Sequence, residues 1–312
     1  MKPAVAGELD AASTRLGSLL TLAAQVSMPA LAAQIIWGFQ VSAMKLAVSE
    51  LDPYLVGMAR AFLAGLALLV VVGRTEQSLG LRTRHWPRML AVGFVGMGLN
   101  TVFWQLGLAK STATNAALIS SASPVWALVL AVAFGYERLV RRRVAGMALA
   151  LLGVVLVIQV DGLKLGGETL LGDLLLVGCS FTWACYNVLA VPLLRVYSPM
   201  KVTAWAMLIG SACLLLFIPL GVRSLDVAGV SAGAWLGLIY AIAVGASVAH
   251  SLWTKAVRTL GPSAALVHSY LMPVVAVAVA ALLLGEQLTL AQAVGAVFVL
   301  AGVTLANSRR RR

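Results

Sequence analysis

Apolar stretches of about 20 residues, separated by short polar breaks, follow one another along almost the whole chain. They lie at residues 26–48, 53–73, 86–109, 113–136, 143–160, 172–194, 199–220, 232–255, 262–285 and 291–307. Each has the length that crosses a bilayer as a helix. Because backbone groups in lipid must pair within their own segment, helix is the expected structure for each stretch. We therefore predict an all-α integral membrane protein with ten transmembrane helices.

The composition favours the bilayer over water as the solvent of this chain. Of its 312 residues, 61% are hydrophobic and only 11% are charged, whereas soluble domains carry about 25% charged residues. The net charge of +12 would suit a nucleic-acid-binding protein. The basic residues, however, form short clusters between apolar stretches, such as Arg138 with Arg141 to Arg143. This distribution is typical of membrane-protein loops, so we predict a lipid bilayer and no nucleic acid as partner.

The basic residues also predict the orientation of the chain. An even number of crossings places both termini on one side of the membrane. If that side is the cytoplasm, 18 of the 23 basic residues face it, as the positive-inside rule requires. We predict a multi-pass protein of a bacterial-type inner (plasma) membrane with both termini cytoplasmic. Residues 1–25 would form an N-terminal cytoplasmic extension and residues 308–312 a basic cytoplasmic tail.

Motifs of the first half recur in the second half in the same order. Trp37 and Pro53 recur 146 residues later as Trp183 and Pro199. Four more residues recur 149 positions later, so that Pro124, Glu137, Gly146 and Gly153 correspond to Pro273, Glu286, Gly295 and Gly302. We predict two five-helix repeats, at 26–160 and 172–307. Since five is odd, the second repeat is inverted, an arrangement that supports alternating access. The paired glycines predict stripes along which helices pack closely.

These motifs resemble those of a known family. The first half reads Trp37-Gly38, Lys45, Pro53 and Arg60, and the second half reads Ala264-Ala265-Leu266, Pro273-Val274 and Gly285-Glu286. The pattern resembles the EamA-type ten-helix branch of the drug/metabolite transporter superfamily. The resemblance implies two inverted five-helix EamA-like repeats that export small metabolites, often amino acids. Trp183, Tyr186 and Ser269-Tyr270 are similar to residues of the branch that exports aromatic amino acids.

One departure from the wider superfamily concerns proton coupling. Small four-helix relatives couple transport to protons through a glutamate within their first membrane helix. The stretch 26–48 carries Trp37, Gln40 and Ser42 near its middle and contains no acidic residue. Proton coupling by that route is therefore not expected, which leaves facilitated diffusion and another form of coupling open.

Polar and aromatic side chains within the apolar stretches are the candidates for a binding site, because they are costly in lipid unless they face a cavity or a neighbouring helix. Trp37 and Gln40 share one helix face, as do Trp183, Tyr186 and Asn187. Pseudo-symmetry would bring both faces to one central cavity, suited to an uncharged or zwitterionic ligand with an apolar body. The predicted substrate-binding residues are Trp37, Gln40, Asn100, Trp104, Trp183, Tyr186, Asn187, His268 and Tyr270. Alternatively, the rings form an interfacial belt.

Three ionisable residues and two prolines leave two interpretations each. Arg60 either binds a substrate carboxylate through its guanidinium fork or extends towards the membrane surface. His250 and His268 either relay protons or pack as neutral, hydrogen-bonded side chains. Pro124 and Pro273 either act as hinges of their helices or impose a fixed bend.

Taken together, these features predict a secondary transporter that exports small metabolites, most often amino acids, by alternating access. The alternatives are a passive facilitator or channel and a membrane-embedded lipid-modifying enzyme. The sequence contains no Walker A motif, no His-Glu-x-x-His site and no Gly-x-Ser-x-Gly motif. We therefore expect no enzyme activity, no catalytic residue, no metal and no cofactor. The expected partner is a small-molecule substrate, and a monomer is the working expectation for the assembly.

Overall fold

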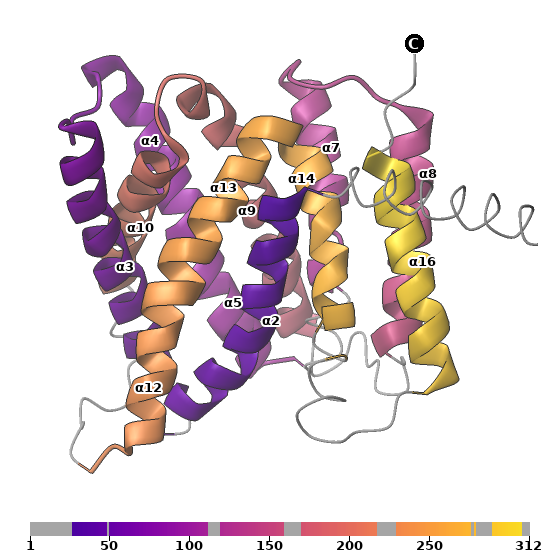
Figure 1. The fold of residues 1–312 in the computed structure, drawn as a ribbon, viewed down its shortest axis with the longest axis horizontal. Helices are drawn as coiled ribbons and strands as arrows, with labels where there is room; N and C mark the ends of the chain where they lie inside the picture. Colours follow the sequence, from indigo (N-terminus) through magenta and orange to yellow (C-terminus); the bar gives the residue numbers. More distant parts are fainter. Residues whose placement is uncertain are drawn as a thin grey trace, which may run out of the picture.

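In the computed structural model, the regular structure of the described residues is entirely helical, which confirms the predicted all-α class. The structure describes residues 27–48, 50–111, 119–158, 170–216, 229–275, 278 and 289–307. The predicted extension 1–25 and tail 308–312 lie outside these ranges. The helices run alongside one another, with α3, α4 and α10 at one side of the bundle and the pair α8 and α16 at the other (Figure 1).

The helices follow the predicted apolar stretches. Those of the first half are α2 (Met28–Val48), α3 (Pro53–Glu76), η1 (Thr83–His85), α4 (Trp86–Gly93), η2 (Phe94–Leu99), α5 (Asn100–Ala109), α7 (Ser123–Ala133) and α8 (Arg141–Ile158). Those of the second half are α9 (Leu170–Leu194), α10 (Pro199–Leu215), α12 (Ala232–Tyr240), η5 (Ala241–Val248), α13 (Ala249–Leu260), α14 (Pro262–Val267), η6 (His268–Tyr270) and α16 (Leu290–Asn307). Five of the described helical segments are long and apolar enough to cross a membrane. The total of ten crossings stays a prediction.

The helices α3 and α10, which correspond to each other in the two halves, begin with the same kind of cap. The side chain of Asp52 caps α3 by accepting hydrogen bonds from the backbone N–H groups of Tyr54 and Leu55, at 2.9 and 3.3 Å. The hydroxyl of Ser198 caps α10 by accepting a bond of 3.1 Å from the N–H of Lys201. In both cases a proline follows the cap and begins the helix, where its missing N–H costs nothing.

Two long helices each contain a π-helical segment. The segment η2 joins α4 to α5, and the segment η5 joins α12 to α13. Their first residues, Phe94 and Ala241, are 147 positions apart, within the spacing of the recurring motifs. The wider turn releases carbonyl groups from the regular α-helical pattern, and such segments are frequent at functional sites. Apolar periodicity did not predict them, because a single wide turn leaves the hydropathy of a helix unchanged.

The predicted glycine stripes pack against each other, on α8 and α16. A Cβ atom on Gly153 would lie 2.6 Å from the carbonyl oxygen of Gly295, and one on Gly146 would lie equally close to that of Gly302. Side chains at these positions would therefore keep the backbones apart. The two helices lie side by side along their length (Figure 1), which confirms the predicted packing role of these glycines.

Most packing occurs between the two halves of the sequence. Helix α2 packs against α12 and α13, α3 against α10, and both α5 and α7 against α9. The largest group of fully buried side chains draws on both halves and includes Met89, Tyr186 and Trp253. The boundary between the halves therefore runs through the core.

The two predicted hinge prolines lie next to irregular helix turns. Pro124 lies in the first turn of α7, directly after the turn at residues 121–122, and not in the interior of a longer helix. This position tolerates proline, because the first N–H groups of a helix have no partner within it. Pro273 lies in the helical stretch 271–275 that follows η6.

Candidate functional site

Five rings from three helices form one aromatic cluster where the halves meet. It consists of Trp37 from α2, Trp183 and Tyr186 from α9, and His250 and Trp253 from α13. The ring centre of Trp37 lies 6.1 Å from that of Trp183, 5.0 Å from that of His250 and 5.4 Å from that of Trp253. The structure thus brings the repeat partners Trp37 and Trp183 together, as pseudo-symmetry predicted. Trp253 is an addition to the predicted set, from a helix that the repeat pattern does not single out.

Trp183 stacks on two other rings of the cluster. Trp183 stacks on Tyr186 with ring centres 5.2 Å apart and an angle of 11° between the planes. On Trp253 it stacks at 6.1 Å and 25°. Trp253 and Tyr186 are almost completely buried, whereas Trp37 and Trp183 are only partly buried. The two partly buried indoles are therefore the tryptophans of the cluster that keep accessible ring surface.

Buried hydrogen bonds of Asn187, Thr203 and Thr254 support the cluster. Asn187 donates a bond of 2.6 Å to the carbonyl oxygen of Trp183 and accepts one of 2.7 Å from the indole N–H of Trp253. The hydroxyl of Tyr186 lies 3.1 Å from that of Thr254, which lies 2.9 Å from that of Thr203. These polar groups satisfy one another while fully buried. Asn187 and Tyr186 were predicted to bind a ligand; in the structure the amide of Asn187 bonds to both tryptophans, and the hydroxyl of Tyr186 bonds to Thr254.

The π-helical segment η5 contributes a backbone carbonyl group to the cluster. The carbonyl oxygen of Gly245 accepts a hydrogen bond of 3.0 Å from the indole N–H of Trp37. It also lies 3.2 Å from Nδ1 of His250. The side chain of Gln40 lies directly on Gly245, in the space that any Cβ atom there would occupy. Glycine at this position therefore lets α2 approach η5 and fixes the orientation of Trp37.

Two polar groups beside the cluster have no partner in the part of the chain that the structure describes. They are Oε1 of Gln40 and Nε of Arg60, and both atoms are buried. Helix α3, which carries Arg60, packs against η5. Helix α2, which carries Gln40, packs against η5 as well. The ion pairs among the described residues join Arg143 to Glu137 and Lys201 to Glu76, so none neutralises Arg60.

An unpaired cation and an unpaired amide oxygen are costly inside a membrane protein, since neither is solvated by lipid. A ligand that carries both an anionic group and a hydrogen-bond donor would satisfy both. A guanidinium matches a carboxylate in shape as well as charge, and an amide oxygen accepts a hydrogen bond from an ammonium group. The arrangement next to the aromatic cluster therefore suits a zwitterion with an apolar body.

The remaining predicted residues lie away from the cluster. The amide nitrogen of Asn100 donates a hydrogen bond of 2.8 Å to the carbonyl oxygen of Cys179. This bond joins α5 to α9. Trp104, on the same helix, is 37% exposed. His268 is fully buried, and its Nε2 accepts a bond of 3.1 Å from the N–H of Ser27 while Nδ1 lies 3.0 Å from the carbonyl oxygen of Ala264. This bonding occupies both ring nitrogens. Tyr270 is buried in a separate group of side chains with α8 and α16.

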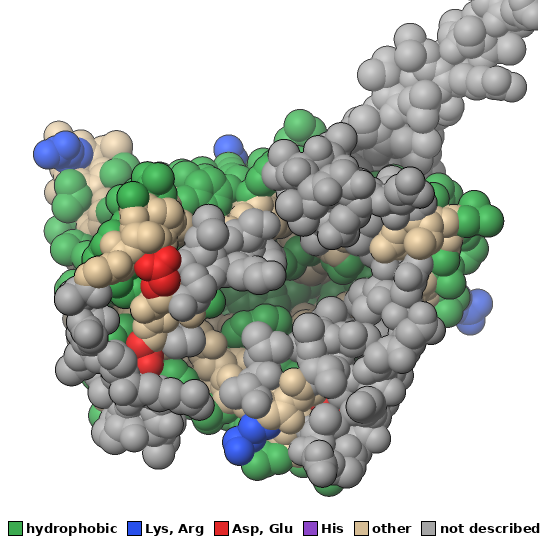
Figure 2. Space-filling model, turned by 90° about the horizontal axis from the view of Figure 1, so that it is seen from below, with side chains coloured by type: hydrophobic (Ala, Val, Ile, Leu, Met, Phe, Trp, Pro, Cys, Tyr) green, Lys and Arg blue, Asp and Glu red, His purple; other side chains and the backbone are tan. Residues whose placement is uncertain are grey.

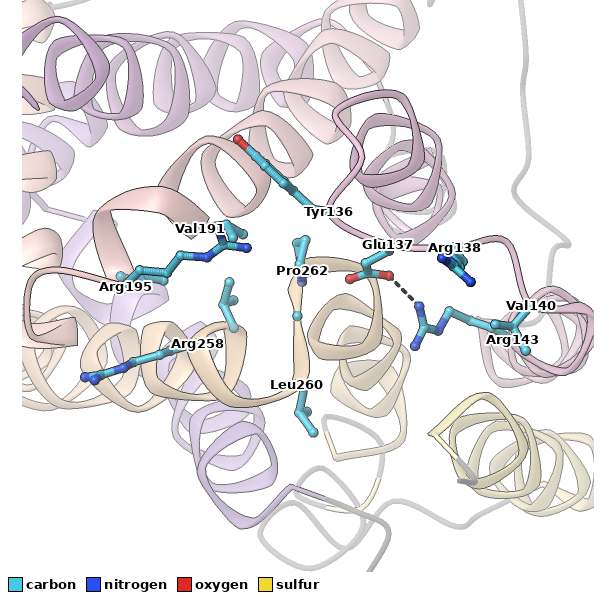
Figure 3. Close-up of a pocket in the computed structure, with 13 residues that line it drawn as sticks. Tyr136, Glu137, Arg138, Val140, Arg143, Val191, Arg195, Arg258, Leu260 and Pro262 are labelled. Carbon is cyan, nitrogen blue, oxygen red and sulfur yellow. Dashed lines mark hydrogen bonds and ion pairs between the residues drawn. The ribbon is translucent and has the colours of Figure 1, made fainter. Parts of the chain in front are cut away.

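A second polar site, which the sequence did not predict, joins the halves at the end of the bundle where α8 begins. The carboxylate of Glu137 accepts hydrogen bonds from the backbone N–H and hydroxyl of Ser263 and forms an ion pair with Arg143. A Cβ atom on residue 261 would lie 2.6 Å from Oε1 of Glu137, and Gly261 has a φ of +87°. Glycine is therefore required there. Glu137 and Arg143 also line a cavity of about 360 Å³ (Figure 3).

The opposite end of the bundle is hollowed. Seen from below, the surface is depressed near its centre and hydrophobic side chains form most of the visible floor (Figure 2). At the end where α2 joins α3, the carboxylate of Glu50 accepts bonds of 2.7 and 2.6 Å from the N–H and hydroxyl of Ser231. Links between the halves are thus present at both ends of the bundle.

Known proteins are similar to this chain over almost its whole length. The EamA-like transporter family matches residues 27–159 and again residues 170–308. An "Uncharacterized transporter" of Archaeoglobus fulgidus is 27% identical over 278 residues, covering 88% of this chain and 95% of the relative. A "Probable amino-acid metabolite efflux pump" of Escherichia coli is 28% identical, covering 88% and 92%. A crystal structure with 20% identity shares the fold, with a TM-score of 0.78 over 90% of this chain and 95% of the other. This chain therefore belongs to the EamA-like transporter family, within the drug/metabolite transporter superfamily.

Proposed function

We propose that this protein exports amino acids and closely related zwitterionic metabolites by alternating access, and that the aromatic cluster is the centre of its binding site. The observation that carries the proposal is that two buried polar groups without a partner in the described structure, on Gln40 and Arg60, belong to helices α2 and α3, which both pack against η5. The name of the Escherichia coli relative, "Probable amino-acid metabolite efflux pump", supports the same substrate class.

Each part of an amino acid has a matching group at this site. The carboxylate would bind the guanidinium of Arg60, for which no other anion is present among the described residues. The ammonium group would bind Oε1 of Gln40 and the electron-rich ring faces. The side chain would contact Trp37 and Trp183, which favours large apolar and aromatic side chains. His250 would contribute a further ring to the same site, with its ring centre 5.0 Å from that of Trp37.

For the mechanism, we propose two inverted repeats that rock around this site. The double match to the family and the matching positions of η2 and η5 support a repeated architecture. In this mechanism Pro124 and Pro273 would serve as hinges beside irregular turns. The distribution of basic residues supports both termini in the cytoplasm of an inner (plasma) membrane.

The links at the two ends of the bundle would act as gates. Glu137 with Ser263 would close the cytoplasmic end, and Glu50 with Ser231 would close the external end. Hydrogen bonds from the hydroxyl and backbone N–H of Ser231 hold the pKa of Glu50 below its ordinary value. The external gate would therefore keep its charged acceptor at neutral pH, and opening would require the two halves to separate.

The proposal is tested by efflux from liposomes that contain the purified protein. Liposomes loaded with labelled phenylalanine, tryptophan, leucine or glutamate are diluted into buffer with and without a pH gradient. We expect the protein to accelerate efflux of the apolar amino acids at least several-fold over protein-free liposomes. A dependence on the pH gradient would indicate proton coupling, and independence would exclude it. Equal efflux with and without protein across the whole panel would contradict the proposal.

A further inference from the structure

The cavity at the Glu137 end of the bundle is lined by more positive charge than its own acid neutralises. Four of its lining residues are arginines: Arg138, Arg143, Arg195 and Arg258. Its one acidic lining residue is Glu137, which is already bound to Arg143 and Ser263. In the close-up, Glu137 and Arg143 lie on one side of Pro262, and Arg195 and Arg258 lie on the other (Figure 3). Three guanidinium groups around the cavity therefore remain without a carboxylate partner in the described structure.

The bonding of two of these arginines leaves donors free for a ligand. Arg143 uses Nη1 for Glu137 and Ser263, but its Nε–H is buried and has no acceptor among the described residues. Arg195 lies over the ring of Tyr136, with 6.0 Å between its guanidinium carbon and the ring centre. This contact places the guanidinium against the ring face and does not use its N–H groups as hydrogen-bond donors. The cavity therefore combines an orphan buried donor with a positioned guanidinium.

The walls of the cavity come from both halves and are held in shape. The loop 136–140 and the start of α8 belong to the first half, and the ends of α9 and α13 with the start of α14 belong to the second. The bonds between Glu137 and Ser263 tie these walls together across 126 positions of sequence. A volume of about 360 Å³ is in the range of small-molecule sites. A ligand here does not have to create the cavity.

The chemistry of the lining selects a phosphate group. Guanidinium forks bind phosphate oxygens in pairs, and a phosphate group offers several acceptors to several arginines at once. Beside the arginines, Leu139 is 68% exposed and Val140 is 46% exposed. An exposed apolar pair next to a basic cavity, at the end of a membrane-protein bundle, matches the boundary between lipid headgroups and acyl chains.

We propose that this cavity is a binding site for a phosphate group, carried by the headgroup of an anionic phospholipid. The headgroup occupies the cavity among Arg143, Arg195 and Arg258, and the acyl chains lie against Leu139 and Val140. Because the bound headgroup contacts walls from both halves, it stabilises the closed arrangement of this end of the bundle. The site is distinct from the aromatic cluster, and its occupation does not depend on which metabolite is transported.

The test measures lipid binding to the purified full-length protein in detergent by native mass spectrometry. Phosphatidylglycerol is compared with phosphatidylcholine of the same acyl chains, and inorganic phosphate is added separately in thermal-unfolding scans. The variant R195Q/R258Q removes two cavity arginines. The matched control R74Q/R88Q removes two exposed arginines of α3 and α4 that do not line the cavity. All variants are checked for an unchanged elution profile.

We expect the wild-type protein to bind phosphatidylglycerol roughly tenfold more tightly than phosphatidylcholine, because only the anionic lipid carries a net charge that the cavity arginines attract. R195Q/R258Q should lose this preference, and R74Q/R88Q should keep it. If the lipids bind equally but inorganic phosphate stabilises the wild type and not R195Q/R258Q, the phosphate site stands and its source is a soluble anion. The proposal is overturned if neither ligand distinguishes the wild type from R195Q/R258Q, or if the control pair has the same effect as the cavity pair.

Discussion

Replacing Arg60 by glutamine is expected to slow the efflux of phenylalanine by roughly 50-fold while the protein stays folded. The reason is that a charge-assisted hydrogen bond to a carboxylate contributes about 1.5–3 kcal/mol, and each 1.4 kcal/mol corresponds to about a factor of ten. R60K should have an efflux rate between those of the wild type and R60Q, because lysine keeps the charge but lacks the planar fork. The measurement is the initial efflux rate from liposomes at equal amounts of incorporated protein.

Phenethylamine provides the matched substrate, since it keeps the ring and the ammonium group of phenylalanine but has no carboxylate. R60Q should leave the efflux of phenethylamine within about twofold of the wild type, because the lost partner is absent from this substrate. R74Q, at the other end of α3, is the control for removing a positive charge from the same helix. If R60Q slowed both substrates equally, or neither, Arg60 would not be the carboxylate partner.

Removing either partly buried indole of the aromatic cluster should have the second-largest effect. W37A and W183A should each slow efflux of aromatic amino acids roughly 30-fold, because truncating an aromatic side chain at the centre of a binding site costs about 2 kcal/mol or more. W183F should retain most transport, since a phenyl ring preserves the stacking on Tyr186 and Trp253. Efflux kinetics of the four proteins, including the wild type, decide the prediction.

Trp235 supplies the control for these substitutions. It lies on α12, is 41% exposed and forms no ring pair with the members of the aromatic cluster. W235A should therefore transport at close to the wild-type rate. Unchanged transport by both W37A and W183A would remove the aromatic cluster from the binding site, and a loss in W235A of the same size would indicate a general effect of tryptophan removal.

The sequence predicted the helical class and the meeting of Trp37 with Trp183 for physical reasons that act locally. A bilayer demands apolar helices of a set length, and a recurring motif places its residues at equivalent points of two similar units. The glycine stripes were predictable for the same reason, because small residues at helical spacing mark close approach. Each of these signals is present within one helix or in the comparison of one helix with its counterpart.

Contacts without such a local signal were not predictable. Trp253 is held in the cluster by a hydrogen bond to Asn187, which is 66 positions away in the sequence. No repeated motif marks this pairing. Glu137 was noted as a recurring residue, but its bond to Ser263 depends on how the two halves dock. Asn100 illustrates a related difficulty: an amide in a membrane helix predicted a ligand contact, and in the structure its nitrogen joins α5 to α9. A polar residue in lipid needs a partner, and sequence alone does not say whether that partner is protein or substrate.

Counterflow of an amino acid tests the central claim most directly, because it distinguishes a site that faces one side at a time from an open channel. Liposomes containing the wild-type protein are loaded with a high concentration of unlabelled phenylalanine and diluted into a trace of labelled phenylalanine. The account predicts transient accumulation of label above its external concentration, and loss of this overshoot in R60Q. A monotonic approach to equilibrium without any overshoot, while phenylalanine still permeates faster than through protein-free liposomes, would contradict alternating access at the aromatic cluster.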